Sequence, residues 1–222
     1  MKEHLQRLIN DLADHDHTKA YGALTQLAEM GPEAAPAAES LYRLLLNDGE
    51  RGYRGLIAQI LVKLAPTLDS GSRGQIRYNL IRSMVRPKDF SPYTVAFSCS
   101  QVLIAMGPDP TCTNELVELL AALHNEYDNA TRSLTSDDLL LIKGVVIDTL
   151  CAWGKSAPSY LVPTFIEWLK HTDFRRVAKI ILMAIGTPAL PALHEITGLF
   201  SNYPSDVKQS AREVIRYIKN HE

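Results

Sequence analysis

The stretch DHTKAYGALTQLAEMGPEAAPAAESLYRLLLND, residues 16–48, predicts a helical hairpin. Its first half places alanine and leucine at the spacing of one helix face. Gly31-Pro32 then ends that helix, because glycine accepts a positive φ and proline cannot continue the hydrogen-bond ladder. A second apolar helix follows from about Pro36, where the missing N–H costs little. Two helices of this length cannot bury their apolar faces alone, so the hairpin predicts stacked neighbours.

Versions of this hairpin recur to the C-terminus. The turns that follow the first helices are expected at Gly31, Ala65, Gly107, Gly154 and Gly186, in steps of 34, 42, 47 and 32 residues. Such steps are typical of two-helix solenoid repeats. Proline indicates the same division, because nine of the twelve prolines fall in these turns or near the expected starts of second helices. In helix interiors each would cost about 3 kcal/mol.

The segments DHTKAYGALTQLAEMGPEAAPAAESL, DFRRVAKIILMAIGTPALPAL and DVKQSAREVIRYI make the chain resemble HEAT repeats, especially the bacterial type also found in phycobilisome-lyase-like proteins. The resemblance covers nearly the whole chain and is weakest at residues 67–100 and 124–138. It implies an all-α fold, a right-handed α-α superhelix (HEAT-like solenoid) of about five helical hairpins plus a terminal half repeat. It also implies one domain over residues 1–222, with second helices lining the concave surface. It is nearly silent on function, because such repeats serve many roles.

Composition favours a single solenoid domain in a cytoplasmic protein. Hydrophobic residues make up 46% of the 222 residues, enough for a continuous core. We expect no strands, no signal peptide and no membrane span, since the longest apolar run, 180–185, is far short of about 20 residues. Cys99 and Cys151 lie in apolar stripes and are expected to be buried free thiols, whereas Cys112 lies near a turn and is expected to be exposed.

The net charge of −2 hides blocks of one sign. Residues 43–88 carry nine basic and three acidic residues. We expect a basic face on the second hairpin that binds an acidic partner, which could be a protein loop, a phosphate or nucleic acid. The alternative is a solvated face balanced by acidic neighbours. The predicted partner-binding residues of this face are Arg51, Arg54, Arg73, Arg77, Tyr78, Arg82 and Arg86.

Residues 109–138 carry seven acidic residues and one basic residue. Within this block, residues 124–138 form a polar connection longer than a tight solenoid needs. One interpretation is a recognition loop that binds a partner through Glu126, Tyr127 and Asp128. The other is a tolerated insertion in which Ser136 or Asp137 caps the next helix.

Catalytic and metal sites are not expected. The sequence lacks HExxH, GxSxG and GxxxxGK[ST]. The run at residues 14–17, Asp-His-Asp-His, is too dense for one helix face, so capping is favoured over metal binding. His171 and His194 are isolated. Trp153 and Trp168, near Asp148 and Glu167, resemble a HEAT-like DNA glycosylase site only loosely, and core packing is the favoured interpretation of Trp153. No cofactor is expected.

The sequence therefore favours a non-enzymatic scaffold or adaptor that binds a protein partner, expected to present an acidic patch, through the concave face and the 124–138 loop. Three alternatives remain open. The first is a nucleic-acid binder or HEAT-like DNA glycosylase, the second a bilin lyase-like chaperone, and the third a toxin-neutralising or regulatory adaptor. The oligomeric state is not predicted.

Overall fold

A computed structural model describes residues 2–14, 16–47, 52–85, 92–125, 135–154, 156, 158–198 and 201–221. All regular elements among these residues are helices, which confirms the predicted all-α solenoid of stacked hairpins. The α-helices are α1 (Lys2–Leu12), α2 (His17–Met30), α3 (Ala38–Asn47), α4 (Arg54–Leu64), α5 (Ser70–Ser83), α6 (Pro92–Met106), α7 (Pro110–Asn125), α8 (Ser136–Gly154), α9 (Pro158–Lys170), α10 (Arg175–Ile185), α11 (Leu190–Thr197) and α12 (Ser205–His221).

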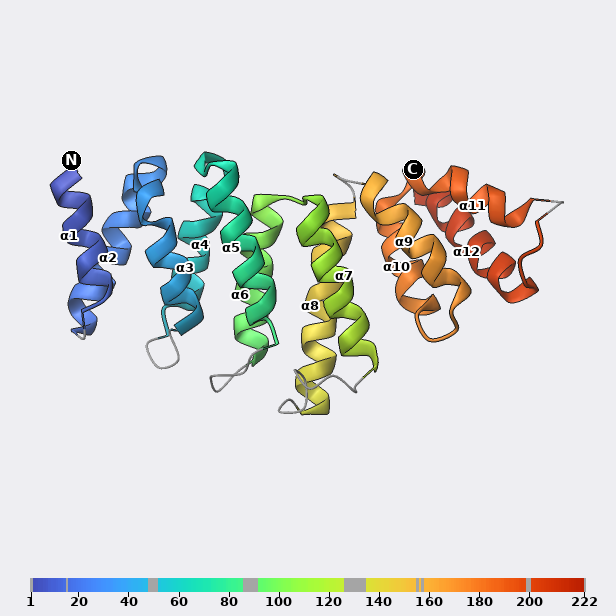
Figure 1. Ribbon diagram of the computed structural model, residues 1–222, viewed down its shortest axis with the longest axis horizontal. Helices are drawn as coiled ribbons and strands as arrows, with labels where there is room; N and C mark the ends of the chain where they lie inside the picture. Colours follow the sequence, from blue (N-terminus) through green and yellow to red (C-terminus); the bar gives the residue numbers. More distant parts are fainter. Residues whose placement is uncertain are drawn as a thin grey trace. The chain divides into compact units, whose positions relative to one another are not determined.

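The chain divides into two compact units, residues 1–107 with 125–145, and residues 108–124 with 146–222. In the first unit the first helices α2, α4 and α6 pack on one another as one layer. The second helices α3 and α5 form the other layer, with α1 beside α3 (Figure 1). In the second unit α10 packs on α12, and α9 packs on α11. Neighbouring hairpins thus cover one another's apolar faces within each unit, as the repeat predicts.

Short 3₁₀ helices join the two helices of three hairpins. They are η1 (Gly31–Ala37), η2 (Ala65–Thr67) and η3 (Thr187–Ala189), and each has a proline at its start. The second helix predicted from Pro36 therefore begins at Ala38, because the chain first takes the tighter 3₁₀ winding. Gly31 and Gly186 have φ of 58° and 78°, in the left-handed region that favours glycine, which confirms these two predicted turns.

Side-chain caps mark the starts of α2 and α8. Asp16 accepts a hydrogen bond from the Thr18 N–H at 2.9 Å, as the sequence suggested. At α8 the prediction of Ser136 or Asp137 as the cap is wrong. The Thr135 hydroxyl accepts from the Asp138 N–H at 3.1 Å, and the Asp138 carboxylate accepts from the Thr135 N–H at 3.3 Å. This reciprocal pair is a capping box. It satisfies two backbone N–H donors, whereas a single cap would satisfy one, so it is the more stable arrangement.

The core is made mainly of leucine, alanine, isoleucine and valine, and Trp153 and Phe165 are its largest fully buried side chains. Periodicity in the sequence predicts that Leu141 and Ile180 face inward, and on both helices the buried face is shifted from that prediction. Leu141 of α8 and Ile180 of α10 are 47% and 42% exposed, whereas Ile142 and Leu182 are fully buried. Both helices are apolar over more than one face, so periodicity alone could not choose the inward face. Within the described residues, no single helix has the length and hydropathy of a membrane span.

The cysteines differ from their predicted exposure at two of three positions. Cys99 is buried as expected, and burial raises the pKa of its thiol to about 12. Cys112 is also buried, although it lies in the first turn of α7, where its N–H donates to the Asp109 carboxylate at 3.1 Å. Cys151 is only half-buried, since the apolar face of α8 is shifted.

A tight contact in the second unit generates a stability prediction. A Cβ added to Gly154 would lie 2.7 Å from Cγ1 of the buried Ile185 side chain. Gly154→Ala should therefore lower the free energy of unfolding by about 1–3 kcal/mol, the usual cost of overpacking. Urea titration followed by circular dichroism measures the change.

Gly144 is the matched control, because it lies on the same helix and an added Cβ would meet nothing within 4 Å. Gly144→Ala should leave stability unchanged or raise it by up to about 1 kcal/mol through helix propensity. Equal effects of the two substitutions would contradict the close packing of α8 against Ile185.

Candidate functional site

The predicted basic face divides into three groups of residues. Arg51 and Arg86 lie outside the described residues. Arg54, Arg73 and Arg77 donate hydrogen bonds to backbone carbonyls. Tyr78 and Arg82 are exposed on α5. Among the five described positions, three are therefore engaged with backbone carbonyls, and Tyr78 and Arg82 are the two that lie exposed.

Arg54 has a structural contact that explains its position. It opens α4, is 8% exposed, and its Nε donates to the Leu45 carbonyl at 3.1 Å, in the last turn of α3. Arg175 has the same place at the start of α10, where its Nε donates to the Leu169 carbonyl of α9 at 2.9 Å. The last carbonyls of a helix lack partners within that helix, so an arginine from the next hairpin satisfies them. A cation at a helix start is unfavourable because the helix dipole is positive there. The contact with the preceding helix explains why these two arginines nevertheless lie at that position.

Arg77 and Arg73 hold the chain in the same way. Arg77 is 8% exposed, and its Nη2 donates to the Met106 carbonyl at the end of α6. Arg73 donates from Nε to the Leu68 carbonyl at 2.8 Å and from Nη2 to the Pro66 carbonyl at 2.9 Å, closing the turn before α5. These two arginines therefore add less positive charge to the exposed surface of the second helices than the sequence indicates.

Tyr78 and Arg82 form an exposed pair one turn apart on α5. The Arg82 Nη1 donates to the Tyr78 hydroxyl, and the guanidinium carbon lies 5.0 Å from the centroid of the tyrosine ring. Tyr78 remains 39% exposed. These contacts restrict both side chains before any partner arrives, which lowers the entropy lost on binding. Aromatic residues and arginine are also the types most enriched at the centres of protein interfaces.

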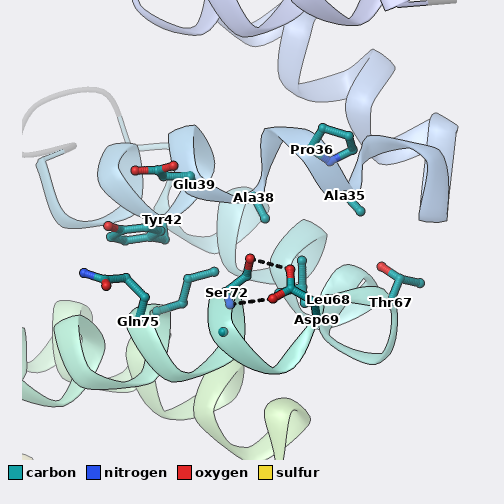
Figure 2. Close-up of a pocket in the computed structure, with 12 residues that line it drawn as sticks. Ala35, Pro36, Ala38, Glu39, Tyr42, Thr67, Leu68, Asp69, Ser72 and Gln75 are labelled. Carbon is teal, nitrogen blue, oxygen red and sulfur yellow. Dashed lines mark hydrogen bonds between the residues drawn. The ribbon is translucent and has the colours of Figure 1, made fainter.

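A groove lies between the second helices of the first two hairpins (Figure 2). Its volume is about 720 Å³, within the range of pockets that bury small ligands. The α3 side contributes Glu39 and Tyr42, and the α5 side contributes Ser72 and Gln75, which face them across the groove in Figure 2. The remaining lining residues are Ala35, Pro36, Ala38, Thr67, Leu68, Asp69, Gly71 and Ile76.

The lining of the groove carries negative charge. Asp69 caps α5, accepting from the Ser72 hydroxyl at 2.6 Å and from its N–H at 2.9 Å (Figure 2). The Ser72 hydroxyl, followed by the Ser72 N–H, holds the pKa of the Asp69 carboxyl below its usual value. Asp69 therefore remains ionised at neutral pH. Glu39 is the second carboxylate, and no cationic side chain is among the described residues that line the groove.

The sequence did not predict this groove. Its lining includes Tyr42, which is 6% exposed and whose hydroxyl accepts from the Asn79 amide at 3.4 Å. These two residues come from adjacent hairpins, 37 positions apart, so no local pattern brings them together. The available signal was the alanine-proline run before α3, whose small side chains leave space beside the neighbouring helix.

The other sequence candidates give no catalytic arrangement in the described part of the chain. Glu126, Tyr127 and Asp128 lie outside the described residues, as does His15. No group of three metal-ligating side chains is found in the ranges described. Trp153 is buried at 1% exposure, as favoured from the sequence, and Trp168 packs against Phe174 with ring centroids 4.5 Å apart.

No protein-family model and no curated protein matches the sequence. Solved structures match nearly the whole chain. A designed armadillo repeat protein in complex with the peptide (KR)4 is 14% identical, with a TM-score of 0.48, over 96% of this chain and 99% of that chain. Two engineered proteins solved by the Northeast Structural Genomics Consortium are 17% and 16% identical, with TM-scores of 0.43 and 0.44. They cover 97% of this chain, and 96% and 98% of their own chains.

This chain is a helical-repeat protein. The likeness to the solved structures is one of fold and, at these identities and scores, carries no ligand from them to this chain.

The two kinds of arginine generate a prediction. Arg77→Met should lower the free energy of unfolding by about 1–3 kcal/mol, because the buried Met106 carbonyl loses its donor. Arg82→Met should change it by less than about 0.5 kcal/mol, because this side chain is exposed. Urea titrations of both variants measure the difference. A larger loss for Arg82→Met than for Arg77→Met would contradict the structural role of Arg77.

Proposed function

We propose that this protein is a non-enzymatic, HEAT-like scaffold that binds a segment of a partner protein on the second-helix surface of its first unit. The observation that carries the proposal is the exposed Tyr78–Arg82 pair beside the α3–α5 groove. An aromatic ring and a guanidinium already in contact present a preorganised binding surface, and the groove offers a concave one.

Of the basic residues predicted from the sequence, only Arg82 is still proposed to bind an acidic group of the partner. Its guanidinium has donors left over after the contact with Tyr78, and a carboxylate is the group that it binds in a planar, two-point manner. Arg54 and Arg77 are left out of the proposed surface because both are buried and hold helix ends. The 124–138 loop stays a predicted second contact.

A selection from a phage-displayed random peptide library tests the proposal. The intact chain should enrich peptides, and Tyr78→Ala or Arg82→Glu should weaken their binding about tenfold or more, as expected for central interface residues. Binding should also weaken as salt rises, since an exposed charge pair is screened beyond about 10 Å at 0.1 M. Fluorescence anisotropy with the selected peptides measures each affinity.

Lys63→Glu is the matched control. Lys63 is exposed on α4, in the first-helix layer, and the substitution changes the net charge as Arg82→Glu does. Selected peptides should bind this variant as they bind the unmodified chain. Failure to enrich any peptide, or equal losses for Lys63→Glu and Arg82→Glu, would contradict a docking site at this pair.

A further inference from the structure

The α3–α5 groove has two kinds of lining that together match one class of side chain. One part of the lining is apolar, from Ala35, Pro36, Ala38, Leu68 and Ile76. The other part carries the carboxylates of Glu39 and Asp69. Lysine and arginine have the same two parts, an apolar stem that can lie along apolar surface and a cationic head. An acidic side chain would meet like charge in this groove.

Glu39 is available to a ligand despite its contact with Arg43. The two side chains form an i,i+4 ion pair, but they are 65% and 66% exposed. Such a solvated pair adds little to stability, so exchange of Arg43 for a cation held in the groove costs little. Asp69 keeps its cap contacts with Ser72 and contributes its negative charge to the groove.

Gln75 offers the groove an unused amide. Its side chain lines the groove and is exposed, and the side-chain amide makes no hydrogen bond with any of the described residues. Its backbone carbonyl accepts from the Asn79 side-chain amide at 2.9 Å, so the contact with Asn79 does not occupy the Gln75 carboxamide. A carboxamide has both a donor and an acceptor, the complement of the C=O and N–H that every peptide unit presents.

We propose that the α3–α5 groove binds an extended segment of a partner protein whose lysine or arginine side chain enters the groove beside Glu39 and Asp69. The Gln75 amide pairs with the main chain of that segment. The inference rests on the proposed function and adds the chemistry of the segment. It assigns the groove to a basic side chain, whereas Arg82 binds an acidic one.

The helix geometry sets the spacing between the main-chain contact of the basic residue at Gln75 and the contact of the acidic residue at Arg82. Gln75 and Arg82 are seven positions apart on α5, two turns on the same face, or about 10 Å along the axis. An extended chain advances by about 3.3 Å per residue, so the basic and acidic residues of the segment should be about three positions apart. The bound segment is therefore one that carries both signs of charge at this interval.

Nuclear magnetic resonance titration of the ¹⁵N-labelled full chain tests the groove directly. The probe is N-acetyl-arginine N-methylamide, which carries one arginine side chain between two peptide units. Saturable shifts are expected for the Gln75 side-chain amide and for the backbone amides of Ser72 and Gln75. N-acetyl-glutamate N-methylamide should not shift these resonances. Absence of shifts with the arginine probe, or equal shifts with both probes, would overturn the proposal.

Matched variants separate the roles of the lining residues. Glu39→Gln should weaken binding of the arginine probe about two- to fivefold, the effect of one exposed charge pair. Glu29→Gln, a change of an exposed carboxylate on α2, should leave it unchanged. Gln75→Ala should weaken the arginine probe but not n-butylguanidine, which has no peptide units. If Glu39→Gln and Glu29→Gln bind the arginine probe with equal affinity, Glu39 does not contact the ligand and the proposed charge recognition is contradicted.

The peptide selection keeps this inference distinct from the proposed function. Selected peptides that need Tyr78 and Arg82 but lack lysine and arginine would overturn the groove assignment and leave the scaffold function standing. Enrichment of a basic and an acidic residue about three positions apart supports both. Groove shifts with the arginine probe, together with a library that yields no peptide, would support the groove and contradict the scaffold.

Discussion

The burial of each hairpin's apolar faces against its neighbours is the interaction on which the structure depends. Within the first unit α4 has the buried side chains Ile57, Ile60 and Leu61, and it packs on α2, α3 and α6. No hairpin of two short helices encloses a core by itself, so the fold requires repetition. In such an array stability is close to a sum of intrinsic repeat terms and nearest-neighbour terms.

Polar contacts complete this arrangement where the helices end. The final carbonyls of α3, α6 and α9 accept from Arg54, Arg77 and Arg175, each supplied by a different helix. At Arg175 the same guanidinium also pairs with Asp206 at 2.7 Å, and this hydrogen bond lowers the pKa of the Asp206 carboxyl. These three arginines therefore serve to join hairpins, and the basic surface that they leave for recognition is smaller than composition indicates.

Much of the fold could be predicted from sequence because its signals are local. Gly31, Pro32 and Pro66 mark turns through their own backbone preferences, which operate in any context. The inward faces of α8 and α10 could not be predicted, because Leu141 and Ile180 belong to helices that are apolar on several faces. Which face turns inward is then decided by neighbouring helices distant in sequence.

The candidate site was harder to predict for the same reason. A run of arginines indicates positive charge, but the carbonyl that Arg77 binds lies 29 positions away. Tyr42 and Gln75 similarly line one groove only because α3 packs beside α5. Tyr78 and Arg82, by contrast, are related by helix periodicity on a single element, and the sequence did identify both as candidates for binding.

Native-state hydrogen exchange of a Leu61→Ala variant tests the nearest-neighbour account most directly. Leu61 is fully buried in α4, so its truncation should cost about 2–5 kcal/mol locally. The account predicts that amide protection falls in α4 and in the adjoining α3 and α6, while α11 and α12 keep theirs. A uniform loss of protection through all helices, α11 and α12 included, would contradict it, because that response belongs to a single closed core.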